Sequence, residues 1–340
     1  MTVDHQTIPP AALRRRGVLR AAGAAGLALA SGGHAWAQGA AGWPTKPVTL
    51  VVPFPAGGGT DAFARPLAAQ FAKSTGKALI IDNRGGAGGT VGASFAAKAQ
   101  PDGYTLFMGG VHHVIAPSMY PKLDYDIEKD FIPLALLANV PQVLVVNPKT
   151  VKATNMTEFL AFVRANPAKL NYASAGSGTS HHLAGELFKL QTNTFITHIP
   201  YRGAGPALQD LIAGNVDMLF DGLGSSASHI KGGRIKALMV SGKKRNPAFP
   251  DVPCAAEVGL PDYTVTTWYG LWAPKGTPAD VQARIVEEVR KLGSAEELKT
   301  VWASNGADFG GMTQQQFSAM VSAEVKRWAQ VVKASGAKLE

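Results

Sequence analysis

Residues 48–65 constrain the fold of this chain more than any other segment. A short apolar run rich in valine, Val48–Val52, predicts a buried strand. Residues 57–59 are three glycines, and the chain then restarts as a helix that we expect Thr60 or Asp61 to cap. Glycine lets backbone N–H groups approach a ligand, and the first amides of a helix lack partners and carry partial positive charge. The segment therefore predicts an anion-binding turn.

Strand-like and helix-like segments alternate from residue 45 onward, at intervals suited to βαβ units. We expect strands at 48–52, 78–81, 105–108, 142–146, 170–173, 195–199, 216–220, 235–240 and 269–273. We expect helices at 61–73, 91–99, 156–165, 180–191, 206–213, 225–230, 279–292, 296–303 and 313–332. This pattern predicts an α/β fold of two doubly wound lobes with a central ligand cleft.

Two extended segments, 138–147 and 265–274, are predicted to connect the lobes. Lobe 1 would then be discontinuous, built from residues 43–140 plus 270–340, and lobe 2 would span 141–269. Doubly wound sheets bind ligands at the carboxyl ends of their strands. Two such lobes facing each other would enclose a ligand between them.

Three later segments repeat the arrangement of strand, glycine turn and helix. They are 83–92, 173–183 and 199–217. Any one of these turns is weak evidence, but several at neighbouring strand ends indicate a shared anion site. Phe54, His113, Tyr201 and Asp221 stand where their side chains could set ligand specificity.

Other site chemistries fit the motifs less well. A triphosphate loop would need a lysine that the glycine turn lacks. A nucleophilic serine is not favoured, because Ser177 lacks the first glycine of the usual elbow. Zinc binding is not favoured, since adjacent histidines on a helix point about 100° apart. The alternative function is an exported nucleotide-dependent oxidoreductase, based on Gly57-x-Gly59-x-x-Ala62 followed by Asp82 at the next strand end.

The N-terminus, residues 1–37, has the pattern of a cleavable export signal. Arg14-Arg-Arg-Gly-Val-Leu-Arg20 resembles a twin-arginine motif, and a weakly apolar core follows at 21–30. Ala35-Trp-Ala37 fits the small-x-small cleavage rule, so we expect cleavage near Ala37/Gln38 and a soluble protein in the periplasm. The single cysteine, Cys254, excludes an internal disulfide and is interpreted as a small buried apolar residue.

The charge pattern argues against a nucleic-acid partner. The formal net charge is +9, but the basic residues after the signal are scattered, and the run at 243–245 is interpreted as a solvated loop. A mildly positive surface favours small acidic solutes.

Taken together, these motifs resemble the extracytoplasmic receptors of the tripartite tricarboxylate transporter family, often called Bug proteins. The matching segments are Pro53-Phe-Pro-Ala-Gly-Gly-Gly-Thr-Asp61 with Ala64-Arg65, Asn83-Arg-Gly-Gly-Ala-Gly-Gly89, Pro101-Asp-Gly-Tyr-Thr-Leu106, Ser174-x-Gly-x-Gly-Thr-Ser-His-His-Leu183, Pro200-Tyr-Arg-Gly203 and Gly214-x-Val-Asp217. They run in order along almost all of the chain after the signal.

The resemblance implies a two-lobed periplasmic binding protein of the Venus-flytrap, type II-like class. Such a protein closes over a small carboxylate or related solute and delivers it to a membrane permease or to a sensor. The resemblance implies neither catalysis, nor a cofactor, nor a metal, and we expect a monomer. It places the ligand carboxylate between the 54–61 turn and the 174–182 loop, with His182 in the family's usual histidine position.

The loop analysis and the resemblance together give one set of candidate ligand-binding residues. They are Phe54, Pro55, Ala56, Gly57, Thr60, Asp61, Gly85, His113, Ser174, Gly176, Ser177, Gly178, Thr179, His182, Tyr201 and Asp221.

Overall fold

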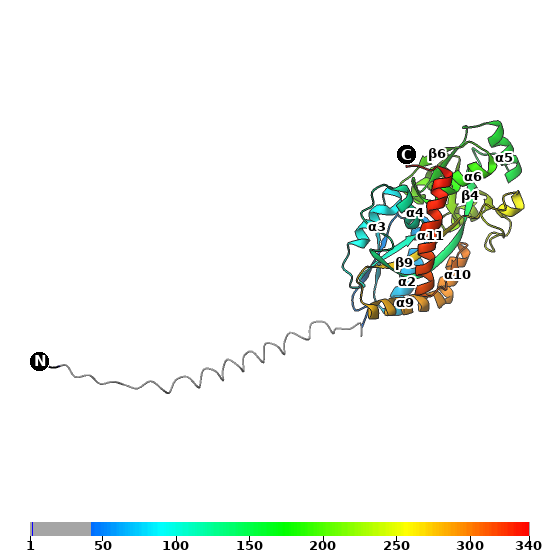
Figure 1. The fold of residues 1–340 in the computed structure, drawn as a ribbon. Coiled ribbons are helices and arrows are strands. Elements are labelled where there is room, and N and C mark those ends of the chain that lie inside the picture. Colours follow the sequence, from blue (N-terminus) through cyan, green and yellow to red (C-terminus); the bar gives the residue numbers. More distant parts are fainter. Residues whose placement is uncertain (1, 3–41, 340) are drawn as a thin grey trace. The chain divides into compact units, whose positions relative to one another are not determined.

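The computed structural model describes Thr2 and residues 42–339, and residues from Gly42 onward form one compact unit (Figure 1). The predicted export signal lies outside the described residues. Within the part that is described, none of the helices is both long and apolar enough to span a bilayer.

The first group of strands begins the fold. β1 (Val48–Val52) pairs in parallel with β2 (Leu79–Asn83) and β3 (Thr105–Gly110). β9 (Thr266–Pro274) pairs antiparallel with β3, and the first part of β4 (Phe131–Val146) pairs antiparallel with β9. The short β10 (Asp308–Phe309) pairs with the same part of β4. The predicted buried strand at 48–52 is confirmed with the same bounds.

The second group of strands uses the rest of β4. Beyond Pro141 this strand pairs antiparallel with β7 (Met218–Gly222) and β8 (Lys236–Val240). β5 (Asn171–Ser174) then pairs in parallel with β7 and with β6 (Thr197–Pro200). β4 therefore belongs to both groups, which supports the two-lobed α/β architecture. The lobe boundaries at residues 141 and 269 stay a prediction.

β4 is longer than the sequence pattern indicated. The segment from residue 131 to 137 was not expected to be a strand, and 138–147 was expected to be a connector. Pro133 lies where the pairing with β9 shifts register, a position at which a missing N–H is tolerated. Because prolines usually interrupt strands, Pro133 and Pro141 led the sequence analysis to miss one continuous strand that crosses between the two groups.

Helices pack on both groups of strands, as the alternation predicted. They are α2 (Gly59–Thr75), α3 (Thr90–Ala97), α4 (Val111–Met119), α5 (Met156–Ala165), α6 (Ser180–Thr192), α7 (Ala204–Ala213), α8 (Leu223–Lys231), α9 (Ala279–Ser294), α10 (Glu296–Ser304) and α11 (Gln314–Ser335), with short 3₁₀ turns η1 (Ala87–Gly89) and η2 (Ala255–Val258). The sequence analysis missed α4, because Pro117 lies inside it and glycines precede it.

The long helix α11 connects regions that are distant in sequence. It packs against α4, β4 and α6, and Figure 1 shows it running along the body from the α9 end to the β6 end. Its buried Phe317 lies 5.1 Å from Trp272 and 6.0 Å from Trp268, measured between ring centroids. Cys254 is buried in an apolar cluster, which confirms its predicted role as a small core residue.

Candidate functional site

A small inner cavity lies where loops from both groups of strands meet. Its free volume of about 10 Å³ has room for about one water molecule. The inner cavity is lined by Phe54, Gly58, Gly59, Thr60, His112, Ala175, His181, Ala204 and Tyr269. Thr60, His112 and His181 are buried, so the cavity presents polar groups from side chains that are largely removed from solvent.

A larger outer hollow of about 330 Å³ adjoins it. The outer hollow is lined by Phe54, Gly86, Ala87, Gly88, Gly89, Tyr120, Ala175, Gly176, Ser177, Pro200, Tyr201, Arg202 and Leu339. Phe54 and Ala175 line both spaces, so they form the partition between the inner cavity and the outer hollow. The Tyr120 hydroxyl donates a hydrogen bond to the Ser177 carbonyl at 3.0 Å and so joins the two sides of the hollow.

The first wall of the inner cavity is the N-terminus of α2. The helix begins at Gly59 with Gly58 as its N-cap, so the prediction that Thr60 or Asp61 caps it is wrong. Gly58 offers no side chain to the first amides, and these amides have no partner within the helix. Asp61 instead shapes the turn, because its carboxylate accepts hydrogen bonds from the Gly57 N–H at 3.0 Å and from Arg65 Nε at 2.8 Å.

Gly59 permits a close approach that no other residue would allow. A Cβ at this position would lie 2.1 Å from the Tyr269 hydroxyl oxygen. Tyr269 is buried, and burial together with the nearby Asp221 carboxylate raises its pKa. The phenol therefore stays protonated and can donate a hydrogen bond at the start of α2.

The second wall is the N-terminus of α7, which also lacks a side-chain cap. Its Gly205 packs against the turn before α2, since a Cβ on Gly205 would lie 2.7 Å from the Ala56 carbonyl oxygen. A Cβ on Gly58 would lie 3.7 Å from the Gly205 nitrogen. Two helix N-termini thus meet here, each with a partial positive charge. An anion between them would stabilise both.

The N-terminus of α6 differs, because its amides already have partners. The Gly178 N–H donates to His182 Nδ1 at 3.2 Å, and the His182 N–H donates to Thr179 Oγ1 at 3.4 Å. The Ser180 N–H donates to Nδ1 of His112 on α4 at 3.1 Å. This last bond links α6 to α4, which lies before β4 in the chain.

Of each adjacent histidine pair, one member lines the inner cavity and the other does not. His112 and His181 line it. His113 Nδ1 accepts the Gly110 N–H at 3.1 Å, and the His182 ring stacks on His198 with 4.2 Å between centroids. The sequence analysis selected His113 and His182. The 100° angle between neighbours could have shown that only one of each pair faces the cleft, but not which one.

A buried carboxylate lies behind His181. Asp221 Oδ1 is 3.6 Å from His181 Nδ1, while Asp221 Oδ2 accepts hydrogen bonds from the Ser225 and Ser226 hydroxyls at 2.7 and 2.5 Å. Burial raises the pKa of Asp221 to about 6, although both serine hydroxyls lower it. Asp221 is therefore mostly ionised at pH 7.

Both cavity histidines are neutral at pH 7. Burial lowers the pKa of His181 to about 4. Burial lowers the pKa of His112 well below its ordinary value, and the neighbouring His181 and His113 lower it further. Because His112 Nδ1 accepts the Ser180 N–H, the neutral His112 ring carries its proton on Nε2 and can donate it.

The predicted ligand-binding residues fall into two groups. Phe54 and Thr60 line the inner cavity, and Phe54, Gly176, Ser177 and Tyr201 line the outer hollow. The others line neither space: Pro55, Ala56, Gly57, Asp61, Gly85, His113, Ser174, Gly178, Thr179, His182 and Asp221. Gly85, for example, packs on Pro55, which a Cβ on Gly85 would approach to 2.7 Å. Direct ligand contact by any of these residues stays a prediction.

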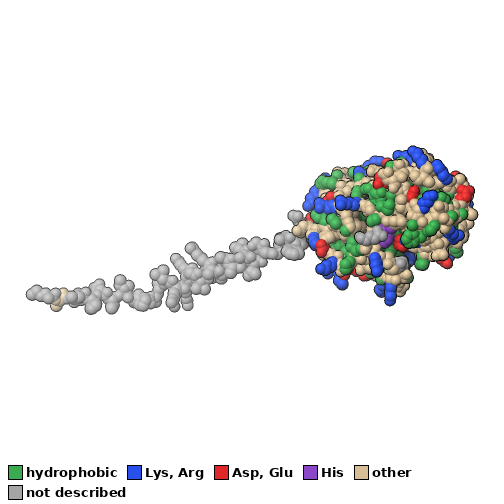
Figure 2. Space-filling view, turned by 90° about the horizontal axis from the view of Figure 1, so that it is seen from above, with side chains coloured by type: hydrophobic (Ala, Val, Ile, Leu, Met, Phe, Trp, Pro, Cys, Tyr) green, Lys and Arg blue, Asp and Glu red, His purple; other side chains and the backbone are tan. Residues whose placement is uncertain are grey.

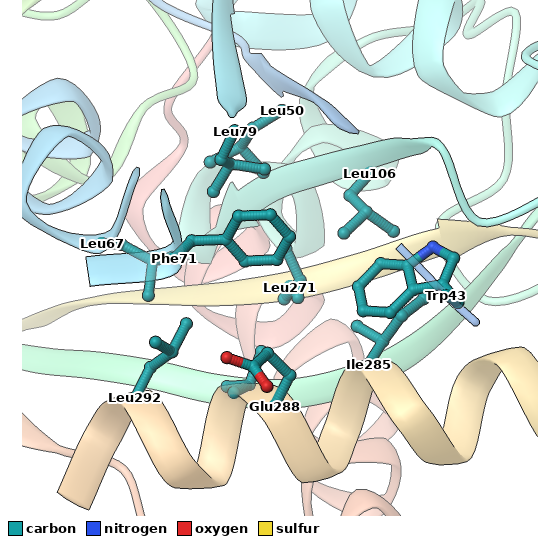
Figure 3. A pocket seen from close by; sticks show the side chains of 11 residues that line it. Trp43, Leu50, Leu67, Phe71, Leu79, Leu106, Leu271, Ile285, Glu288 and Leu292 are labelled. Carbon is teal, nitrogen blue, oxygen red and sulfur yellow. The ribbon is translucent and has the colours of Figure 1, made fainter. Parts of the chain in front are cut away.

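A third cavity, shown in Figure 3, lies between α2, α9 and the first strands. It has room for about one water molecule, and Glu288 is the polar side chain among the apolar ones that line it. One Glu288 carboxylate oxygen is buried there without a hydrogen-bond partner among the described residues. With no second polar group to orient a solute, this space is a packing gap and not a site.

In the described part of the chain, no three His, Cys, Asp or Glu side chains lie together as a metal site would require. On the face shown in Figure 2, Lys and Arg side chains are scattered among acidic and uncharged ones.

Comparison with known proteins places the chain in a family. Residues 63–337 match the family described as Tripartite tricarboxylate transporter family receptor. The chain belongs to this receptor family. A relative, the UPF0065 protein in the tcbD-tcbE intergenic region of a Pseudomonas species, is 39% identical over 310 residues, which are 91% of this chain and 92% of that protein. Protein BugT of Bordetella pertussis is 34% identical over 317 residues, covering 93% and 97%.

Solved structures of family members are similar to this receptor in fold. The periplasmic binding protein BugD has a TM-score of 0.84 at 33% identity, and an R. palustris protein with adipate has 0.84 at 35%. MatC from Rhodopseudomonas palustris with bound malate has 0.80 at 36% identity. The first two comparisons cover 88% of this chain and the third 85%, each with 100% of the other chain. The two-lobed periplasmic binding protein fold is confirmed.

The family consists of receptors and not of enzymes, which removes the oxidoreductase alternative. The structure gives the physical reason. The N-terminus of α7 packs on the 57–59 turn and leaves beside it a cavity of about 10 Å³, which is too small for a pyrophosphate. The Asp82 carboxylate is also engaged by Arg84 Nε at 2.7 Å.

Proposed function

We propose that this receptor captures a small carboxylate in the inner cavity and delivers it to the membrane permease of a tripartite tricarboxylate-type transporter. The observation that carries the proposal is the meeting of two helix N-termini, α2 and α7, neither of which has a side-chain cap. A carboxylate between them would accept hydrogen bonds from amides that otherwise lack partners.

The donors around the cavity supply enough free energy for a useful affinity. They include the first amides of α2, the Thr60 and Tyr269 hydroxyls, and His112 Nε2. A hydrogen bond to a charged group contributes about 1.5–3 kcal/mol, and micromolar affinity corresponds to about −8 kcal/mol. Four such bonds would suffice after ordering costs. Because the walls come from both lobes, binding would favour the closed form over the open one.

The relatives support this chemistry. Adipate and malate, found with two of the similar structures, are both dicarboxylates. The outer hollow of about 330 Å³ could take the part of the solute that extends beyond the inner cavity, with the exposed Arg202 on its rim. The predicted export signal would place the receptor in the periplasm, as a monomer, where it can meet a permease.

Calorimetry of the protein without residues 1–37 tests the first half of the proposal. We expect at least one acid from a panel of mono-, di-, tri- and aromatic carboxylates to bind with micromolar or tighter affinity. The matching uncharged amide of that acid should not bind. A panel without a single binder, or equal binding of acid and amide, would contradict carboxylate capture.

Uptake measurements test delivery. Cells that lack the gene for this receptor should lose transport of the labelled carboxylate and regain it when the gene is restored. Unchanged uptake alongside intact binding in vitro would assign the receptor a sensing role and remove the transport half of the proposal.

A further inference from the structure

We propose that the solute carries a hydrogen-bond donor on the carbon next to its carboxylate, as a 2-hydroxy or 2-amino acid does, and that His181 Nε2 accepts this hydrogen bond. The inference rests on the proposed function, since it concerns a second group of the captured carboxylate. It starts from the pairing of His181 with Asp221 at the edge of the inner cavity.

His181 and Asp221 each have one buried atom that could serve as the other's hydrogen-bond partner. Among the described residues, His181 Nδ1 and Asp221 Oδ1 are both buried without a hydrogen-bond partner, and they face each other at 3.6 Å. A buried carboxylate oxygen requires a donor, because an unsatisfied polar group is costly away from water. A proton on His181 Nδ1 meets that need once the two atoms approach by a few tenths of an ångström.

This tautomer makes His181 an acceptor toward the cavity. With the proton on Nδ1, the neutral imidazole carries a lone pair on Nε2. Burial lowers the pKa of His181, so the ring stays neutral at pH 7. His112, on the same cavity, has the opposite tautomer, because its Nδ1 accepts the Ser180 N–H and leaves a proton on Nε2. One histidine therefore donates into the cavity and the other accepts.

The other side of the cavity offers donors suited to a carboxylate. The amides at the start of α2 point outward from the helix, and the Tyr269 hydroxyl approaches Gly59. An acceptor such as His181 Nε2 would repel a carboxylate oxygen, but it fits an O–H or N–H group. The site thus combines an anion-binding wall with one acceptor backed by a buried negative charge.

The size of the cavity fixes where the donor must lie on the solute. The free volume of about 10 Å³ has room for roughly one water-sized group, and both the start of α2 and His181 line it. A carboxylate that binds at α2 must widen this space, and a group that then reaches His181 is only a bond or two from it. That spacing selects a donor on the adjacent carbon over one at the far end of a chain.

Matched solutes test this selection directly in the wild-type protein. Calorimetry would compare succinate with both enantiomers of malate and aspartate, and propionate with both enantiomers of lactate and alanine. We expect one 2-hydroxy or 2-amino acid of a series to bind about tenfold or more tightly than its unsubstituted partner. Malate against aspartate, and lactate against alanine, show whether the donor is a hydroxyl or an ammonium group.

Two substitutions connect the preference to His181. In His181→Leu the acceptor is gone, and the affinity ratio between substituted and unsubstituted acid should fall to about one. In His181→Gln a side-chain carbonyl can reach the place of Nε2, so part of the ratio should return. His229→Gln, on α8 and away from the cavity, is the histidine control and should keep the wild-type ratio.

The outcomes separate this inference from the proposed function. Equal binding of substituted and unsubstituted acids by the wild-type protein overturns the inference while carboxylate capture stands. A ratio that persists in folded His181→Leu also overturns it. Absence of any carboxylate binding overturns both. If His181→Leu does not fold, the wild-type ratio and the His181→Gln variant still decide the question.

Discussion

The N-termini of α2 and α6 both follow a strand and a glycine-rich turn, yet side chains accept hydrogen bonds from the first amides of α6 and not from those of α2. At α2 the N-cap is Gly58, and no side chain satisfies the first amides. At α6 the N-cap is Thr179, whose hydroxyl oxygen accepts the His182 N–H, and His182 Nδ1 in turn accepts the Gly178 N–H. Similar sequence patterns thus produce one terminus that is open to an anion and one that is already satisfied.

This difference shows what the residue at the N-cap decides. A serine, threonine, asparagine or aspartate cap stabilises a helix by occupying the amides that could otherwise bind an anion. A glycine cap gives up part of that stability and leaves the amides available. In this receptor α2, together with α7, which begins after Gly203, follows the second strategy.

A substitution at Gly59 tests the open terminus of α2, and we expect it to have the largest effect on solute affinity. In Gly59→Ala the new Cβ would lie 2.1 Å from the Tyr269 hydroxyl oxygen and would displace it from the cavity. Loss of one or two hydrogen bonds to the carboxylate lowers affinity by about two orders of magnitude. Calorimetry and ligand-induced shifts of melting temperature would measure it.

Gly58→Ala is the matched comparison for that variant. Its Cβ would make only ordinary contacts, the nearest at 3.7 Å, and its backbone φ of −87° suits alanine. It should lose much less affinity than Gly59→Ala. Equal losses in the two variants would mean that Tyr269 does not take part in binding.

The pH dependence of solute binding tests the role of His112, which joins α4 to α6 through the Ser180 N–H. We expect its effect on affinity to be of intermediate size. Burial lowers the pKa values of His112 and His181 from the ordinary 6.5 in this structure, and we expect the open form to expose both rings, so that the closed form binds fewer protons. Binding should therefore be fully present above pH 6.5 and weaken as the pH falls toward 4. Asp221, whose pKa is raised to about 6, opposes this by taking up a proton on burial as the pH falls below 6.

On closure the two histidines release up to two protons and Asp221 takes up one. Below pH 6 the affinity should therefore fall by up to about tenfold for each pH unit. Calorimetry from pH 7.5 to 5.0, with a solute ionised throughout, would measure the slope. His112→Asn keeps an acceptor for the Ser180 N–H but does not titrate, so its slope should be smaller. A slope that is unchanged in this variant would exclude His112 as a source.

Much of the architecture could be predicted from the sequence, because it follows from local patterns. The helix at Met156–Ala165 has the predicted bounds, and most other elements differ by a few residues. The failures have local causes of another kind. β4 was predicted too short because it contains Pro133 and Pro141, and α4 was not predicted because it contains Pro117. Pro133 lies at a register shift, where its missing N–H is tolerated, whereas Pro117 is the seventh of the nine residues of α4, which forms without that hydrogen bond.

The site was harder to predict, because it depends on contacts between distant segments. The sequence indicated the glycine turn and the need for an anion at α2. It could not show that α7 would supply the opposing N-terminus, since the residues before α6 and α7 do not reveal which of the two helices packs on the 57–59 turn. It also could not choose between the members of a histidine pair. The choice of His112 and His181 follows from the approach of α4 to α6, which the Ser180 N–H bond records.

Exchanging the two kinds of cap tests the comparison with the smallest expected effects. Gly58→Ser would place a hydroxyl oxygen where it can accept an α2 amide, so it should raise the free energy of unfolding by a few tenths of a kcal/mol and lower solute affinity a few-fold. Thr179→Ala would remove the cap of α6 and lower the free energy of unfolding by about 1 kcal/mol. Because the α6 amides do not face the solute in this scheme, its affinity should change less than that of Gly58→Ser. Urea unfolding and calorimetry on both variants would give the four values. If Thr179→Ala loses more affinity than Gly58→Ser, the carboxylate is held by the 174–182 loop, and α6 is the binding terminus after all.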